Sequence, residues 1–264
     1  MPDTPRYVVG VGLKMYMGHR QALSWMRRVA DIARTHPALA SGNVTLFALP
    51  SFIALVEATQ IFEGSGVKVG AQDLFSDDIG PFTGEVSGSE LAEIGCTFVE
   101  VGHAERRNIL GESDSLVSSK TAAAFRNGLT PVVCIGEKLE QHPADAAAEC
   151  IRQLDATLVA SRASGLIGSL ILAYEPQWAI GGPRPAGPVH IGEVSDRLRA
   201  ALADDHRLSG SSLIYGGSAG PGMLGQLNGK VDGLFLGRSA HDTKALKTVL
   251  DEVWVLMPKA DRVM

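Results

Sequence analysis

The amino-acid sequence predicts one domain over residues 1–264, folded as a (β/α)8 barrel. The length of 264 residues is close to the roughly 250 that such a barrel needs. Short apolar segments alternate with longer segments of helical periodicity along the whole chain. No Ser/Gly-rich linker, low-complexity repeat or long run of charge marks the boundary of a second domain.

Eight segments are predicted to be strands because they are short, apolar and rich in β-branched residues. In chain order they are Tyr7–Val11, Val44–Leu49, Val67–Gly70, Thr97–Val101, Pro131–Ile135, Leu170–Ala173, Ser212–Tyr215 and Val231–Leu236. Strands that are apolar on both faces are typical of a parallel sheet that helices cover.

The longer segments between the strands have the apolar spacing of helices. In chain order they are Arg20–Thr35, Ser51–Phe62, Ser115–Asn127, Ala144–Ser161, Val189–Asp204, Pro221–Leu227 and Thr243–Val255. Repeated right-handed crossovers build either an open doubly wound sheet or a closed barrel. An open dinucleotide-binding sheet needs a Gly-x-Gly-x-x-Gly turn after its first strand, with an acid about 20 residues further on. The turn here reads GVGLKMYMGH and lacks that spacing, which favours the barrel.

The composition is that of a globular protein, with 45% hydrophobic and 20% charged residues. A net charge of −5 provides no broad basic field, which argues against a nucleic-acid or membrane-surface partner. The N-terminal residues MPDTPR do not resemble a signal peptide, and no apolar run approaches the ~18 residues of a membrane span. We therefore expect a soluble, cytoplasmic protein.

Its cysteines, Cys96, Cys134 and Cys150, lie outside any C-x-x-C spacing and are expected to be core thiols, not disulfide partners or zinc ligands.

Three residues with reactive side chains directly follow predicted strands. Lys14 follows the first strand, His103 follows the fourth in VEVGHAERR, and Glu175 follows the sixth in LAYEPQWAIGG. Taken singly, each has an ordinary explanation: Lys14 could be a solvated surface charge, His103 a polar residue with its hydrogen bonds made, and Glu175 an acid at the start of a helix. However, the carboxyl ends of barrel strands carry the active site, and all three residues lie at that end.

The same three residues suit one reaction class. Moving a carbonyl between adjacent carbons requires a base for the α-proton, a hydrogen-bond donor for the enediolate oxygen and a fixed positive charge. Glu175, His103 and Lys14 supply these three functions. The turns IYGGSAG and FLGRSA follow the seventh and eighth strands, where barrels commonly bind phosphate. The alternative is that these are two tight turns that need glycine at positive φ.

Several motifs resemble those of the triosephosphate isomerase family. They are TGEVS at 83–87, GHAERR at 102–107, CIGE at 134–137, AYEPQWAIGG at 173–182, YGGS at 215–218 and DGLFLGRSA at 232–240. They occur in the family's order, and the resemblance covers roughly residues 7–256. It implies a TIM barrel that isomerises a small phosphorylated sugar without a cofactor or metal ion.

The resemblance also implies a role for each candidate residue. Glu175 would be the base that moves the proton, His103 the neutral electrophile and Lys14 the cation beside the developing oxyanion and phosphate. This division of roles is the established one for triosephosphate isomerase. Glu105 and Glu137 would lie close behind these residues and support them.

Two further sets of residues are implied by the same resemblance. Backbone N–H groups would bind the phosphate at Gly181, Ser218, Gly237 and Arg238. The TGEVS loop resembles one that enters a neighbouring subunit, which implies a homodimer. Its interface would include Thr83 and Glu85 on this loop, and Gln72 and Asp73 of the AQD motif on the opposing surface.

The sequence departs from the family at three places. Gly12 and Tyr16 occupy positions where the family has Asn, so a side chain that contacts substrate is missing at Gly12. Losing that hydrogen bond costs roughly 0.5–3 kcal/mol, and the change leaves room for a larger substrate. Pro183, Arg184 and Pro185 replace Gly, Lys and Thr after AIGG, which predicts a stiffer lid hinge. In the last phosphate loop, Arg238 replaces a Gly and adds a cation.

These departures leave three functions open. The main prediction is a triosephosphate isomerase that interconverts dihydroxyacetone phosphate and glyceraldehyde 3-phosphate through an enediolate. The first alternative is a related isomerase for a tetrulose phosphate such as L-erythrulose 1-phosphate. The second alternative is a non-catalytic barrel that binds phosphorylated metabolites or a partner protein, which would turn over neither substrate.

Overall fold

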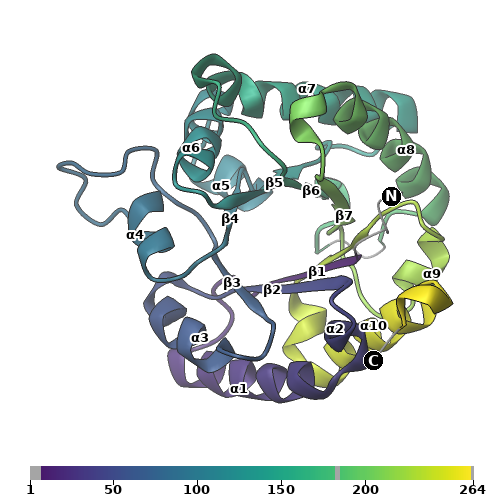
Figure 1. Cartoon of the computed structure of the whole chain (residues 1–264). Helices are drawn as coiled ribbons and strands as arrows, with labels where there is room; N and C mark the ends of the chain where they lie inside the picture. Colours follow the sequence, from purple (N-terminus) through teal and green to yellow (C-terminus); the bar gives the residue numbers. More distant parts are fainter. Residues whose placement is uncertain (1–6, 182–184, 263–264) are drawn as a thin grey trace.

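The computed structural model describes residues 7–181 and 185–262. Eight parallel strands form a closed barrel in the order β1-β2-β3-β4-β5-β6-β7-β8, surrounded by helices (Figure 1). The strands are β1 (Tyr7–Gly12), β2 (Val44–Leu49), β3 (Lys68–Ala71), β4 (Phe98–Val101), β5 (Thr130–Ile135), β6 (Ile171–Tyr174), β7 (Ser212–Tyr215) and β8 (Gly233–Leu236). The predicted (β/α)8 barrel is confirmed, and each predicted strand overlaps an observed one. That residues 1–264 form one domain stays a prediction.

The helices follow the predicted order. They are α1 (His19–Thr35), α2 (Pro37–Ala40), α3 (Leu55–Phe62), α4 (Gly88–Glu93), α5 (Ala104–Ile109), α6 (Asp114–Arg126), α7 (Pro143–Ser164), α8 (Pro188–Asp204), α9 (Met223–Leu227) and α10 (Thr243–Leu256). The short helices α2, α4 and α5 were not predicted, because four to six residues show little helical period; α9, with five residues, was predicted. The predicted helix over Ser51–Phe62 begins as a separate 3-10 turn, η1 (Phe52–Ala54).

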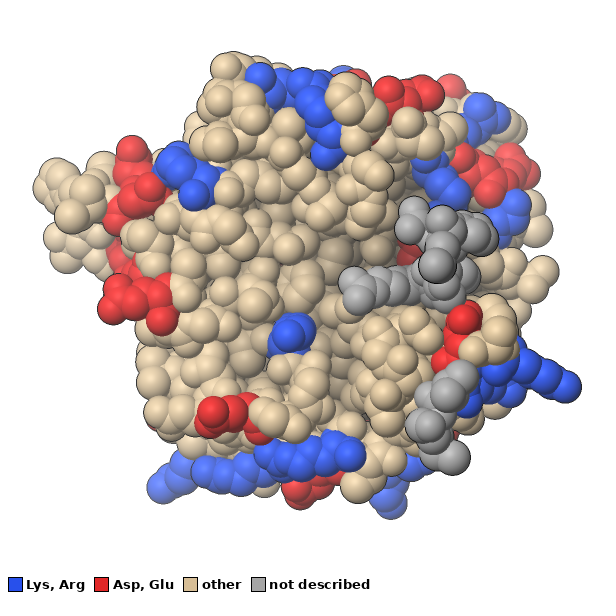
Figure 2. All heavy atoms as spheres, viewed as in Figure 1, with Lys and Arg blue, Asp and Glu red and all other residues tan. Residues whose placement is uncertain are grey.

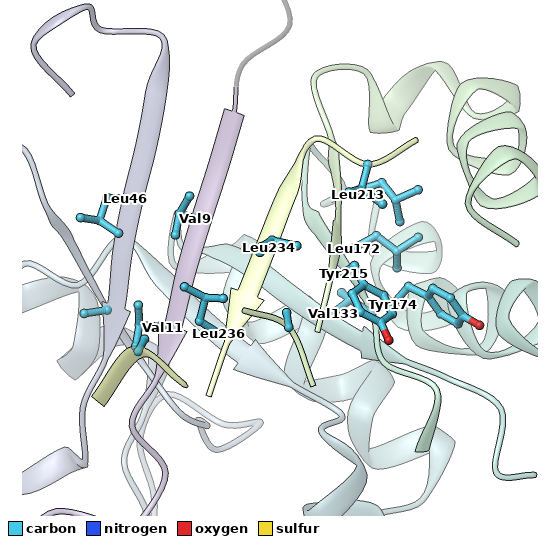
Figure 3. Close-up of a cluster of buried hydrophobic side chains, with 14 of the residues drawn as sticks. Val9, Val11, Leu46, Val133, Leu172, Tyr174, Leu213, Tyr215, Leu234 and Leu236 are labelled. Carbon is cyan, nitrogen blue, oxygen red and sulfur yellow. The ribbon is translucent and has the colours of Figure 1, made fainter. Parts of the chain in front are cut away.

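Alternating side chains of each strand face two different cores. One set packs with buried residues of the surrounding helices; Figure 3 shows some of its members, among them Val9, Leu46 and Leu234, on their strands. The other set fills the barrel interior and includes Phe47, Phe98 and Phe235. The Phe47 ring lies 4.8 Å from the Phe98 ring and 6.0 Å from the Phe235 ring, centroid to centroid. These aromatic side chains make the interior a packed core.

Glycine at position 10 makes this interior packing possible. A Cβ atom there would collide with the Phe47 ring, so the absence of a side chain on β1 creates the space that the ring fills. Cys96, Cys134 and Cys150 are buried and their thiols are free.

Figure 2 shows one face of the barrel, where acidic and basic side chains intermix around the edge. Within the described residues, no helix combines the length and the apolar character needed to cross a membrane. The cytoplasmic location stays a prediction.

Candidate active site

A cavity of about 790 Å³ opens at the carboxyl ends of the strands. Its lining includes Lys14, His103 and Glu175. The barrel thus brings together Lys14 and Glu175, which are 161 positions apart in the sequence. The lining also includes the predicted phosphate-binding residues, which are Gly12, Gly181, Ser218, Gly237 and Arg238. Parallel strands place their carboxyl ends at one edge of the barrel, and this geometry assembles the site.

Lys14 follows β1 and has a backbone φ of +48°, a conformation that residues other than glycine rarely adopt. Gln72 stabilises this turn, because its Nε2 donates to the carbonyl oxygens of Lys14 at 3.1 Å and Leu49 at 2.9 Å. The Lys14 Nζ lies 2.6 Å from Oε1 of Glu105. Burial alone would lower the pKa of Lys14, but its hydrogen bond with Glu105 and the charges of Glu105 and Glu175 raise it. Lys14 is therefore a fixed cation at neutral pH.

His103 follows β4 and caps the N-terminus of α5. Its Nδ1 accepts a hydrogen bond from the backbone N–H of Glu105 at 3.1 Å. An imidazole nitrogen that accepts cannot carry a proton, so the ring is neutral and the proton is on Nε2. This Nε2 lies 3.5 Å from Oε2 of Glu175. His103 thus presents an N–H donor to the cavity.

Glu175 directly follows β6 and is only 5% exposed. Two glycines make room for it, since a Cβ at Gly136 would collide with its backbone and a Cβ at Gly216 with its carboxylate. Its Oε2 is buried and has no hydrogen-bond partner among the described residues. Burial raises the pKa of Glu175, and the charge of Lys14 only partly offsets this. A raised pKa suits a carboxylate that accepts and returns a proton.

The anion-binding end of the cavity lies at the last two strands. Within the described part of the chain, the backbone N–H groups of Gly237 and Arg238 donate to no acceptor. The Ser218 N–H, in contrast, donates to the carbonyl oxygen of Gly216 at 2.9 Å and is engaged in this structure. The Arg238 guanidinium lies 5.7 Å from the centre of the Tyr16 ring, a cation–π contact at the rim.

Glu137 is completely buried behind the cavity and holds the segment after Glu175. Its Oε1 accepts from Trp178 Nε1 at 2.8 Å and from the Tyr174 hydroxyl at 3.1 Å, and lies 3.2 Å from Nε2 of His190. In the segment after AIGG, Ala186 is buried. Pro183 and Arg184 lie outside the described residues, so the stiffness of this lid hinge stays a prediction.

The predicted interface residues occupy two different settings. Thr83 and Glu85 are exposed on the loop between β3 and α4, which extends away from the barrel in Figure 1. Gln72 contacts Lys14, and Asp73 is buried with Lys120 Nζ at 2.7 Å. Their place at a subunit interface stays a prediction.

Glu100, a third carboxyl group in the cavity, was not predicted from the sequence. It points from β4 into the barrel, is 7% exposed and lines the cavity. The available signal was an acid in the middle of the apolar strand FVEV. Such a residue is unusual in a buried strand and marks a candidate functional group.

Comparison with known proteins agrees with this geometry. The family model described as triosephosphate isomerase matches residues 7–253. The chain is 48% identical to an L-erythrulose-1-phosphate isomerase of Pectobacterium atrosepticum, over 97% of this chain and 98% of that protein. It is 38% identical to an L-erythrulose-1-phosphate isomerase of Rhizobium etli, covering 93% and 91%. A triosephosphate isomerase of Mycolicibacterium vanbaalenii is 37% identical, covering 87% and 89%.

Proposed function

The chain belongs to the triosephosphate isomerase family, and we propose that within this family it isomerises L-erythrulose 1-phosphate. The observation that carries the proposal is the 48% identity, over nearly the full length, to a relative of that name. The main prediction from sequence, a triose phosphate as substrate, therefore yields to the alternative. The isomerase class and the phosphorylated sugar substrate are common to both.

The reaction follows from the substrate's chemistry. L-Erythrulose 1-phosphate has its carbonyl at C2 and a hydroxyl at C3, followed by a hydroxymethyl group. Glu175 removes the C3 proton, the C–H electrons form a C2–C3 double bond, and the C2 carbonyl becomes an enediolate oxygen. His103 Nε2–H and Lys14 stabilise that oxygen. His103 then passes the O3 proton to O2, and Glu175 returns its proton to C2.

The product has its carbonyl one carbon farther from the phosphate. For a triose phosphate this transfer gives an aldose, but for the tetrulose phosphate it gives a second ketose, an erythrulose 4-phosphate. The catalytic groups and proton transfers are the same in both cases. Substrate choice thus depends on the space around C3.

The cavity has that space beside Gly12. A Cβ at this position would lie 3.4 Å from Cζ of Phe235 and within 4 Å of no atom outside that ring among the described residues. The missing side chain thus leaves open volume at the cavity floor, into which a hydroxymethyl group fits. Gly181, Ser218, Gly237 and Arg238 would bind the phosphate, with Arg238 adding charge. Ser218 would have to exchange its hydrogen bond to Gly216 for one to the phosphate.

We also infer a homodimer. The β3–α4 loop exposes Ile79 at 92%, and Met15, next to the catalytic Lys14, is 94% exposed. Such apolar surface is expected to be covered, and the loop of one copy would cover Met15 of the other. Reversing the charge at Glu85, by Glu85→Lys, should weaken association and activity together. A fully active monomer in sedimentation at assay concentration would overturn the dimer.

The substrate is tested by following L-erythrulose 1-phosphate and dihydroxyacetone phosphate by NMR in D2O. The expected kcat/KM is at least tenfold higher for the tetrulose phosphate, with deuterium entering at the carbon that receives the proton. Turnover of triose phosphate alone would identify a triosephosphate isomerase. Turnover of neither would identify a binding protein.

Gly12→Asn provides a second test of the same proposal. Asn fills the space beside Phe235, so the preference for the tetrulose over the triose phosphate should fall by roughly 10- to 1,000-fold. Gly18→Asn is the control, because a Cβ at Gly18 meets no atom within 4 Å and Gly18 does not line the cavity. An unchanged ratio in Gly12→Asn would remove this position from substrate selection.

A further inference from the structure

Glu100 is a buried carboxyl group that the proposed reaction does not use. Its side chain lies in the barrel interior, between the apolar floor residues and the cavity. Cys134 donates to Oε1 through a long contact of 3.6 Å from its Sγ. Among the described residues no other hydrogen bond and no ion pair reaches the Glu100 carboxyl. Its 7% residual exposure therefore faces the cavity.

A purely structural role does not account for this residue. Burying a carboxyl group with one weak donor costs free energy, and an apolar side chain would pack at least as well beside Phe98 and Val132. Burial raises the pKa of Glu100 to about 7; the charge of Lys14 opposes the rise and that of Glu175 adds to it. A substantial fraction of Glu100 is thus protonated at neutral pH, where it can both donate and accept a hydrogen bond.

The position of Glu100 matches one end of the substrate. The candidate phosphate-binding groups of Gly237 and Arg238 follow β8, and His103 follows β4 on the other side of the cavity. A substrate whose phosphate is at β8 and whose C2 oxygen is at His103 directs its remaining carbon toward β4. Glu100 is on β4, three residues before His103, and lies deeper in the barrel. Gly12 lines the same cavity from β1, so the C4 hydroxymethyl group would lie between Gly12 and Glu100.

We propose that Glu100 determines specificity by hydrogen bonding to the C4 hydroxyl of the tetrulose phosphate. This inference rests on the proposed function, because a triose phosphate has no fourth carbon. The hydroxyl supplies the hydrogen-bond partner that the carboxyl lacks within the protein, and the carboxyl discriminates against substrates without that hydroxyl. Buried polar groups left unpaired by the wrong substrate are a strong source of selectivity.

The test compares Glu100→Val and Glu100→Gln with wild type on both phosphates. Glu100→Val should lose roughly 100- to 1,000-fold in kcat/KM for L-erythrulose 1-phosphate and change less than about threefold for dihydroxyacetone phosphate. Glu100→Gln replaces the carboxyl by an amide that can still bind the hydroxyl, so kcat/KM for the tetrulose phosphate should fall at most about tenfold. Ile171→Val, in the same interior layer but outside the cavity lining, should affect both substrates equally.

A substrate analogue separates binding from general damage to the barrel. In wild type, 4-deoxyerythrulose 1-phosphate should react roughly 100-fold more slowly than the parent. In Glu100→Val the two should differ by less than about threefold, because the partner of the C4 hydroxyl is gone. If Glu100→Val does not fold, Glu100→Gln should still show a smaller penalty for the deoxy substrate than wild type does.

Two failures can be told apart. If wild type turns over the tetrulose phosphate but Glu100→Val loses equally on both substrates, or the deoxy penalty persists in the variants, only the role of Glu100 is overturned. If wild type does not turn over the tetrulose phosphate, the proposed function fails, and this inference is overturned with it.

Discussion

Two sets of buried carboxyl groups differ in how their charge is neutralised. In the first, the paired cluster, Asp73 and Glu112 contact Lys120 and Arg106 at 2.5–2.7 Å. In the second, the cavity carboxyls Glu100 and Glu175, neither carboxyl forms a hydrogen-bonded ion pair with a described cation; their shared neighbour is the thiol of Cys134.

The difference separates carboxyl groups that hold the fold from those available to a ligand. The paired cluster joins the segment after β3 to α5 and α6. Burial opposes ionisation of Glu112, but hydrogen bonds from Lys120 and Arg106 outweigh it and lower its pKa. The pKa of Glu100 is raised by burial. Glu112 and Glu100 are both 7% exposed, and for these two carboxyls the cations beside Glu112 account for the opposite directions, whereas burial still raises the pKa of Asp73 within the cluster.

The largest expected effect is on stability, at the paired cluster. Lys120→Met leaves Asp73 and Glu112 buried with a single remaining cation, which should lower the free energy of unfolding by roughly 3–5 kcal/mol. Lys247→Met is the control, because its pair with Asp251 is about half exposed and is worth at most about 0.5 kcal/mol. Urea unfolding measures both. Similar small losses in the two variants would contradict the structural role of the cluster.

The next effect is on activity, at the cavity carboxyls. Glu175→Asp keeps the charge but withdraws the carboxylate by about 1 Å, which should slow turnover roughly 100-fold. Its free energy of unfolding should change little, whereas Glu112→Asp should lose stability and retain the activity of its folded fraction. Steady-state kinetics and unfolding of both variants provide the comparison. Unchanged turnover in Glu175→Asp would remove this residue from the mechanism.

The smallest effect concerns pH and stability at Glu100. Its pKa is raised to about 7 in the folded state, so the folded protein binds the proton more tightly and loses stability as pH rises from about 4.5 through 7. Glu100→Gln has no carboxyl group to titrate and should not show this loss. Relative to wild type, its free energy of unfolding should therefore be roughly 2–3 kcal/mol higher at pH 8 than at pH 5, at about 1.4 kcal/mol per pKa unit. Urea unfolding at the two pH values tests this. A pH-independent difference would mean that Glu100 does not titrate in this range.

The sequence alone determined the order of the strands and of the seven predicted helices, and the edge at which Lys14, His103 and Glu175 lie. Apolar runs and turn residues are local signals, and a parallel strand necessarily places the residue after it at its carboxyl end. The same local logic located the glycine-rich turns around Ser218 and Gly237.

Tertiary structure decided which buried acid has a partner. Alternation along β4 implies that Glu100 and Val99 face opposite sides, but it does not say which side is the barrel interior. Asp73 and Lys120 are 47 residues apart, and nothing local to either segment indicates that they meet. The hydrogen bond that occupies the Ser218 N–H likewise depends on how its turn closes. Charge pairing and burial are properties of groups brought together in space, so the distinction between the paired cluster and the cavity carboxyls arises only when the barrel closes.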